Sequence, residues 1–94
     1  MKFRWTRRWA WLAVSLLVAL PTHSSTESEW FVNRNAQDDG DHEVHRDTCR
    51  YLPAPRNRIA LGDHDDCGEA LRAAREHFAQ VDGCYYCARA CDTG

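Results

Sequence analysis

The sequence predicts a small, cysteine-rich α+β domain with two or three short strands and one main helix. Three observations lead to this class. The chain has 94 residues, which allows one domain at most. Apolar residues recur at helical spacing in one strong stretch, and short apolar runs bounded by turn residues occur before it. Five cysteines accompany a core too small to be stable by burial alone, so we expect a metal ion, disulfides or both to support it.

The N-terminal segment has the pattern of a secretory signal peptide. Residues 1–8 carry four positive charges and no acid, and an apolar run follows from Trp9 to Leu20. Twelve helical residues rise about 18 Å, well short of the ~30 Å hydrocarbon core of a bilayer. Small polar residues surround Ser24, after which we expect cleavage. The sequence thus predicts a signal peptide over residues 1–24 and export to the periplasm or the extracellular space. Membrane attachment is expected only if this segment stays uncleaved.

The charge of the remaining chain bears on its partners. Without residues 1–24 it has eight arginines, no lysine and fourteen acidic residues, a formal charge of −6. Nucleic-acid binding calls for a basic face, so this balance argues against such a partner. This negative charge is compatible with an unknown protein partner. Export also permits disulfides, which cytosolic reductants would prevent.

The composition divides the exported part in two. Residues 25–41 are expected to form a flexible polar lead-in, in which only Trp30–Val32 is apolar enough to dock as a short strand. Residues 42–94 are expected to form the folded metal-binding domain. Alternation around Val44 predicts a first strand there, and Ile59–Gly62 predicts a second that ends in a turn.

One amphipathic helix is predicted from about Cys67 to about Val81. Its apolar face consists of residues spaced four, three, four and three apart: Cys67, Leu71, Ala74, Phe78 and Val81. Asp66 stands at the N-cap position, with Glu69 three residues on as in a capping box. Gly83 is expected to adopt the left-handed turn that ends such a helix.

Two pairs of residues have the spacing of zinc ligands. Cys84 and Cys87 are separated by two residues, so a tight turn can aim both sulfurs at one point. His45 and Cys49 form a second half, with His42 as a nearby alternative histidine. Disulfide pairing and redox catalysis compete with zinc at Cys84 and Cys87, although a thioredoxin-like motif would open a helix and this one follows a helix.

Cys67 and Cys91 remain after that assignment. They could form a disulfide, which would suit an exported protein and use every cysteine. Alternatively, one of them replaces His45 as a ligand, or Cys67 is a buried free thiol on the helix.

The order of these motifs resembles that of the small zinc-binding domains related to the metal-binding domain of Ada, the methylphosphotriester DNA repair protein. "VHRDTCRYL" is similar to the opening of those domains, "EALRAA" to their alanine-rich helix, and "CYYC" to their terminal knuckle. The resemblance covers roughly residues 42–91 and implies a zinc site in an α+β fold.

This chain departs from Ada at the residue that carries the repair chemistry. The methyl-accepting cysteine is replaced by His45, and an imidazole cannot act as a thiolate acceptor. The resemblance therefore implies the fold and the metal site without the repair activity. A zinc held by one histidine and three cysteines has no open position, so we expect a structural zinc and no enzymatic activity. The remaining alternatives are a disulfide-stapled secreted domain without metal and a thiol-disulfide exchange protein.

Overall fold

The structure is a computed structural model that describes residues 27–94. The predicted signal peptide lies outside the described residues. The described part is an α+β domain, which confirms the predicted class. It has a four-stranded sheet, one α-helix and two short 3-10 helices, with the bounds β1 Ser28–Asn33, β2 His42–Arg46, η2 Pro55–Asn57, β3 Arg58–His64, α2 Cys67–Ala74, β4 Val81–Gly83 and η3 Arg89–Cys91. None of the helices in this part is long and apolar enough to cross a membrane.

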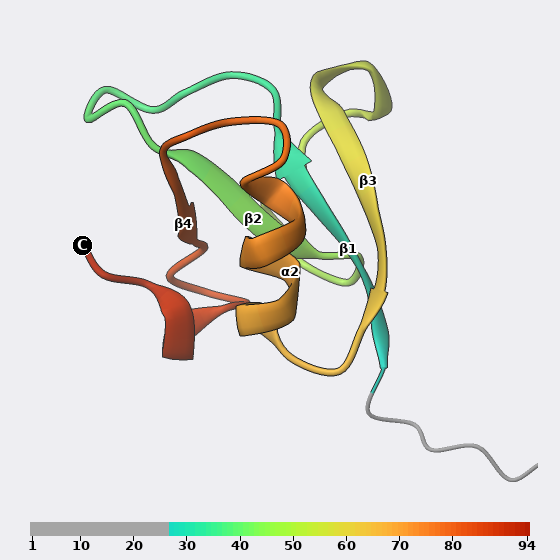
Figure 1. Cartoon of the computed structure of the whole chain (residues 1–94). Coiled ribbons are helices and arrows are strands. Elements are labelled where there is room, and N and C mark those ends of the chain that lie inside the picture. The colour runs from blue at the N-terminus through green and yellow to red at the C-terminus, as the bar shows by residue number, and fades with distance from the viewer. Residues whose placement is uncertain (1–26) are drawn as a thin grey trace, which may run out of the picture.

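The sheet has the order β3-β1-β2-β4. β1 is antiparallel to both of its neighbours, whereas β4 runs parallel to β2. Figure 1 shows α2 lying across one face of this sheet, with β4 at the edge beside β2. Because β2 and β4 are parallel, their carboxyl ends lie at the same end of the sheet.

The prediction that the folded domain starts near residue 42 is wrong, because β1 is an inner strand of the sheet. Trp30 and Val32 are completely buried, and the Trp30 indole N–H donates a hydrogen bond to the carbonyl of His64 at 3.1 Å. Polar neighbours on both sides of the short apolar run led to the expectation of a lead-in. The run is nevertheless enough to build the centre of the sheet once β2 and β3 flank it.

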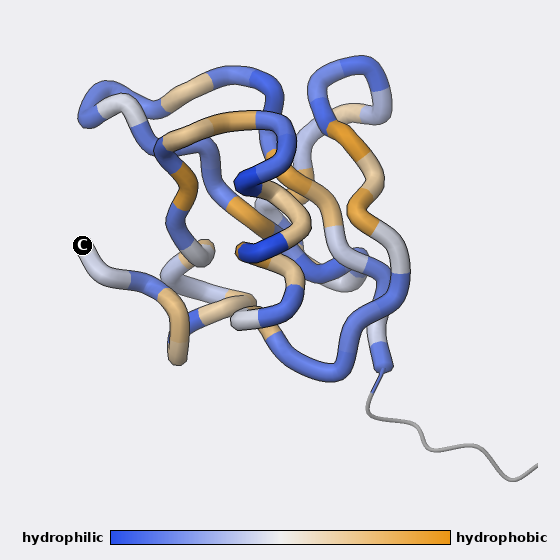
Figure 2. Tube along the Cα trace, viewed as in Figure 1, coloured by the Kyte–Doolittle hydropathy of each residue, from blue (hydrophilic) through white to orange (hydrophobic). Residues whose placement is uncertain are grey.

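The core lies between α2 and the sheet. The sheet contributes Trp30, Val32 and Val44, and α2 packs its buried alanines and Leu71 against them. Figure 2 shows that the apolar segments lie along the strands and that the connecting loops are mostly hydrophilic. Only ten hydrophobic residues are buried in the described part, so the core is small. Such a core needs additional stabilisation.

The second predicted strand continues past its expected end. β3 pairs Gly62 with Trp30 and Ala60 with Phe31, which leaves Leu61 as the extra residue of a β-bulge. Gly62 has φ +89°, a backbone conformation that glycine adopts without strain. The expected turn is therefore a bulge inside a strand that runs on to His64.

The predicted start of the helix is confirmed and its predicted end is wrong. The Asp66 carboxylate accepts the backbone N–H of Glu69 at 2.9 Å, as an N-cap does. α2 ends at Ala74, however, and the chain then turns. Phe78 stacks on the His42 ring with centroids 3.6 Å apart, and Val81 begins β4. Phe78 lies in the turn and Val81 in the strand, and both side chains pack against the core that α2 also covers. Their spacing in the sequence therefore matches that of a helix although neither residue is helical.

Gly83 does not cap the helix as predicted, but lies in β4 where another chain segment approaches closely. A Cβ at this position would lie 2.7 Å from the Ala88 carbonyl oxygen and 2.9 Å from the Cys91 Cβ. We expect Gly83→Ala to destabilise the protein by about 1–3 kcal/mol, as overpacking does. Urea unfolding measures the change.

Gly68→Ala provides the control for that experiment. Gly68 lies in α2, where alanine is favoured over glycine, and its added Cβ would meet only a carboxylate oxygen of Asp66 at 3.3 Å. Its stability should stay within about 1 kcal/mol of the wild type. Equal stability of the two variants would show that the close packing of the Ala88–Cys91 segment on Gly83 does not exclude a side chain there.

Candidate metal centre

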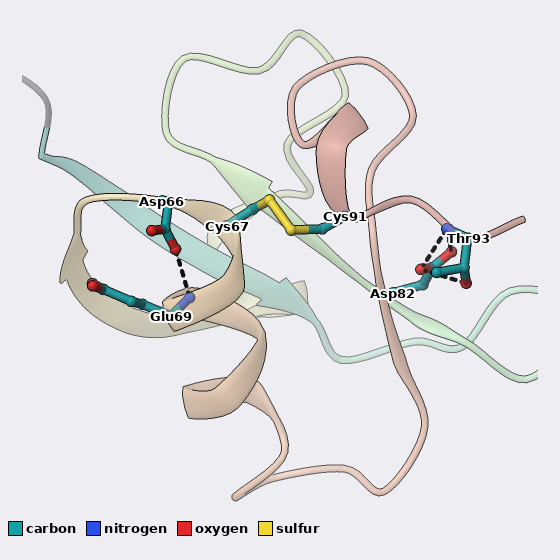
Figure 3. Close-up of a disulfide and its surroundings, with 6 residues drawn as sticks. All are labelled: Asp66, Cys67, Glu69, Asp82, Cys91 and Thr93. Atoms are coloured by element: carbon teal, nitrogen blue, oxygen red, sulfur yellow. Dashed lines mark hydrogen bonds between the residues drawn. A yellow bond between two sulfur atoms is a disulfide. The ribbon is translucent and has the colours of Figure 1, made fainter.

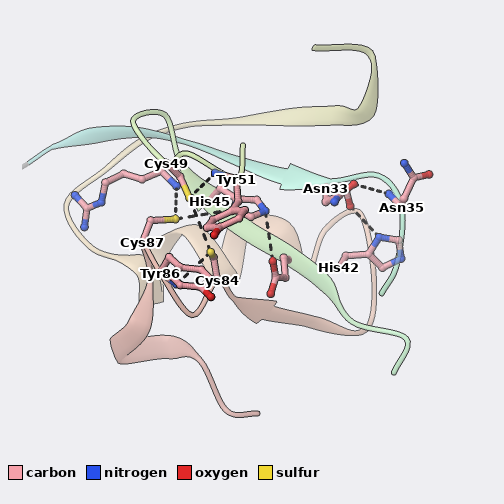
Figure 4. Close-up of polar contacts among 11 residues, drawn as sticks. Asn33, Asn35, His42, His45, Cys49, Tyr51, Cys84, Tyr86 and Cys87 are labelled. Carbon is pink, nitrogen blue, oxygen red and sulfur yellow. Dashed lines mark hydrogen bonds and ion pairs between the residues drawn. The ribbon is translucent and has the colours of Figure 1, made fainter. Parts of the chain in front are cut away.

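The fold brings together the four side chains that sequence spacing singled out as ligands. The potential ligand atoms of His45, Cys49, Cys84 and Cys87 all lie within 4.8 Å of one another. Figure 4 shows them converging from two chain segments. His45 is on β2 and Cys49 is in the turn after it, whereas Cys84 and Cys87 belong to the turn after β4. This group could hold a metal ion.

The parallel pairing of β2 and β4 explains why these two turns meet. Val44 is paired with Gly83 in the sheet, and the Cys84 N–H donates to the Val44 carbonyl at 3.0 Å. Each strand then leads directly into a tight turn. The Cys49 N–H bonds to the Arg46 carbonyl in the first turn, and the Cys84 carbonyl accepts from Ala88 in the second. Cys49 and Cys84, which are 35 positions apart, are therefore neighbours because the strands before them end side by side.

Two separations within the cluster are close to the edges of a zinc tetrahedron. Zn–S bonds of about 2.3 Å and Zn–N bonds of about 2.0 Å place two sulfurs about 3.8 Å apart and a sulfur and a nitrogen about 3.5 Å apart. The sulfurs of Cys49 and Cys84 are 3.9 Å apart, and the Cys87 sulfur is 3.9 Å from Nδ1 of His45. These two pairs would have to contract by a few tenths of an ångström to reach ligand positions, and a pair at the 4.8 Å limit of the cluster by about 1 Å.

Each of the three sulfurs accepts one backbone N–H. Cys49 accepts from Tyr51 at 3.4 Å, and Cys84 accepts from Tyr86 at 3.3 Å. These two bonds are equivalent, because each links a cysteine to the residue two positions on. Cys87 accepts from Arg46 at 3.3 Å, across the two turns. Donors directed at sulfur favour the thiolate form, which is the form that binds a metal.

Burial shifts the pKa values of three members of the cluster, His45, Cys84 and Cys87. Burial lowers the pKa of His45 to about 4, so the imidazole is neutral at neutral pH and has a free lone pair. Burial also raises the pKa of Cys84 and of Cys87, and the neighbouring thiols raise that of Cys87 further. A cation would remove this penalty by compensating the charge of the thiolates.

Two tyrosines lie over the outer side of the cluster. The rings of Tyr51 and Tyr86 are 4.5 Å apart between centroids, and they follow the two equivalent N–H···S turns. The charge interaction with Tyr86 is the main factor that raises the pKa of Tyr51, because two phenolates this close would repel each other. Tyr86 is 64% exposed and Tyr51 is 49% exposed, so these rings border the site without sealing it.

Cys67 and Cys91 are joined in a disulfide, separate from the cluster. Figure 3 shows this bond connecting the first residue of α2 to η3. Nearby, the buried Asp82 carboxylate accepts hydrogen bonds from the backbone and the hydroxyl of Thr93. Together the two contacts attach the C-terminal segment to the domain. Cys49, Cys84 and Cys87 remain as free cysteines.

His42, the alternative histidine, lies away from the cluster. Its Nδ1 is 2.9 Å from the Asn33 carbonyl oxygen, and its ring stacks on Phe78. Figure 4 shows it at the far end of β2 from the cysteines. Its position two residues before Val44 places it on the helix side of the sheet, whereas His45 lies on the other side.

Two contributors to the site were missed by sequence analysis. One is the repeated Cys-x-Tyr pattern, Cys49–Tyr51 and Cys84–Tyr86, which marks the two equivalent turns. The other is Glu43, whose carboxylate oxygen is 3.6 Å from Nε2 of His45. Residues two apart on a strand point to the same side, and this alternation was the signal available for Glu43.

Comparisons of the chain with protein-family models, with curated proteins and with solved structures found no match. The resemblance to Ada-related domains stays a prediction. The geometry of the cluster and its surroundings therefore carries the functional argument.

Proposed function

We propose that this is an exported small protein whose four-residue cluster binds one structural zinc ion, and that the domain acts as a binding or interaction module. The observation that carries the zinc assignment is the set of three N–H···S hydrogen bonds beside a buried neutral imidazole. Sulfur and imidazole ligands at tetrahedral separations are typical of zinc. The N-terminal pattern of residues 1–24 supports export.

The proposed zinc has a structural role. Four protein ligands fill a tetrahedral site and leave no position for a substrate or a reactive water. The ligands come from the turns after β2 and β4, so the ion would tie together two segments that a small core holds weakly. We infer that the metal supplies folding free energy and that the protein is not an enzyme.

The two alternatives fit the cluster less well. A disulfide-stapled domain without metal must leave at least one thiol of the cluster unpaired, since three free cysteines remain there. A thiol-disulfide exchange protein needs an attacking thiol with a lowered pKa. Burial raises the pKa of both cysteines of the C-x-x-C pair, which opposes that chemistry.

A pair of histidine variants tests the zinc proposal. His45→Ala removes the buried nitrogen ligand and is expected to weaken zinc binding by about 100-fold or more, because the remaining ligand set is incomplete. Competition between the mature protein and a chromophoric chelator measures the affinity. Native and denaturing mass spectrometry of the same wild-type sample should show one zinc ion and a chain about 2 Da lighter than the reduced form.

His77→Ala is the matched control. His77 is an exposed histidine in the turn after α2, outside the cluster, and its replacement should leave the zinc affinity unchanged. Equal effects of the two substitutions would remove His45 from the ligand set. A native protein without zinc and with one thiol of the cluster unpaired would favour the metal-free alternative.

A further inference from the structure

We propose that Glu43 is a positioning residue of the zinc site: its carboxylate accepts the Nε2–H of His45 and holds the Nδ1 of the ring toward the metal. This inference rests on the proposed zinc function. It concerns a residue that would not touch the metal and whose role is separate from that of the four ligands.

The two nitrogens of His45 face different surroundings. Nδ1 lies 3.9 Å from the Cys87 sulfur. Nε2 is turned toward Glu43, with 3.6 Å between the nitrogen and the carboxylate oxygen Oε1. The ring is thus placed between three sulfurs on one side and one carboxylate on the other.

Nε2 of His45 is the unsatisfied polar atom of the site. His45 is only 1% exposed, and its Nε2 is a buried side-chain atom with no hydrogen-bond partner within the described residues. Buried polar atoms normally have hydrogen-bond partners. The unpartnered Nε2 beside the Glu43 carboxylate therefore indicates that a hydrogen bond can form between these two groups. A shift of about half an ångström would bring the 3.6 Å separation into hydrogen-bond range.

Metal binding would supply the reason for that shift. When Nδ1 gives its lone pair to a metal, the ring proton must be on Nε2, which then becomes a donor. A carboxylate is a strong acceptor for this donor, and it also fixes the orientation of the ring and increases the basicity of the ligating nitrogen. Glu43 would therefore act on the metal through the imidazole.

Glu43 is itself held in place by the loop before β2. Burial raises the pKa of the Glu43 carboxyl, and the neighbouring Gln37 side chain partly offsets this by favouring the carboxylate form. Gln37 in turn anchors a tight turn, because its N–H donates to the Asp41 carbonyl and its carbonyl accepts from Gly40, both at 2.8 Å. The position of the Glu43 carboxylate thus depends on the loop before β2 as well as on β2 itself.

The test compares the zinc affinities of the mature wild-type protein, Glu43→Ala and Glu43→Gln by chelator competition. Glu43→Ala leaves the Nε2–H without an acceptor and should weaken zinc binding by about 10- to 100-fold, the usual effect of losing such a partner. Glu43→Gln keeps an acceptor oxygen without the charge, so its loss should be smaller. Glu69→Gln is the control, because Glu69 lies at the same 3.6 Å from a ring nitrogen of His64, away from the cluster.

NMR of the imidazole nitrogens in the zinc-loaded wild-type protein provides a readout that does not depend on variant folding. Zinc should be on Nδ1 of His45, with a slowly exchanging proton on Nε2. Zinc on Nε2, or an unchanged affinity in Glu43→Ala, would overturn the role of Glu43 while leaving the zinc site intact. A wild-type protein that binds no zinc would instead overturn the proposed function, and this inference with it.

Discussion

Removal of the zinc ion by a chelator is expected to lower the free energy of unfolding of the mature protein by about 4 kcal/mol or more. A ligand that binds only the folded state stabilises it by about 4.1 kcal/mol when its free concentration is 1,000 times the dissociation constant. Structural zinc sites are typically tight enough to exceed this condition. The loss is comparable with the whole stability of a small domain, which is often near the lower end of 5–15 kcal/mol.

The size of this effect follows from the packing. The turns that carry Cys49 and Cys84 leave adjacent strands. The second turn contributes Cys84 and Ala88 to the buried core, whereas Cys49 of the first turn is only partly buried against it. Without the ion, burial raises the pKa of Cys84 and keeps its thiol protonated, so no charge attraction replaces the lost bonds. We expect the two turns and β4 to loosen first.

Thermal and urea unfolding followed by circular dichroism, with and without chelator, measure this change. Re-addition of zinc should restore the transition, and chelator saturated with zinc beforehand should have no effect. Identical transitions for the metal-free and the zinc-loaded protein would show that the ion does not contribute to folding.

Removal of the Cys67–Cys91 disulfide is expected to cost about 3.5 kcal/mol. The bond joins residues 24 positions apart, and the chain-entropy model gives this magnitude for a loop of that length. The double variant Cys67→Ala/Cys91→Ala also frees η3, which otherwise is tied to the start of α2. Urea unfolding of the zinc-loaded protein measures the difference.

Zinc stoichiometry distinguishes the disulfide from the metal site in that variant. Neither Cys67 nor Cys91 belongs to the cluster, so the variant should still bind one zinc ion. The Asp82–Thr93 hydrogen bonds should keep part of the C-terminal segment in place. A variant that lost zinc binding together with stability would indicate that Cys67 or Cys91 takes part in the ligand set.

The features that were predictable from the sequence are those with local signals. Asp66 and Glu69 marked the start of α2, because capping depends on neighbouring residues. The spacing of Cys84 and Cys87 marked a turn that can present two sulfurs, for the same reason. The α+β class followed from one strong helical period among short apolar runs.

The features that were missed depend on contacts between distant segments. Trp30–Val32 was expected at most to dock as a short strand of a polar lead-in, yet β3 pairs with β1 along its length and Trp30 lies in the core. The end of α2 was placed too late because Phe78 keeps the helical period while it packs on His42 from a turn. The parallel pairing of β4 with β2, which brings the two halves of the cluster together, had no local signal at all.

X-ray absorption at the zinc edge of the purified mature protein tests the central claim most directly. Three sulfurs and one imidazole nitrogen on a single ion should give a first shell with about three Zn–S distances near 2.3 Å and one Zn–N distance near 2.0 Å. Replacement of His45 by alanine should remove the imidazole contribution. A shell of four sulfurs, or one made mainly of oxygen and nitrogen, would contradict the proposed convergence of His45, Cys49, Cys84 and Cys87 on one zinc ion.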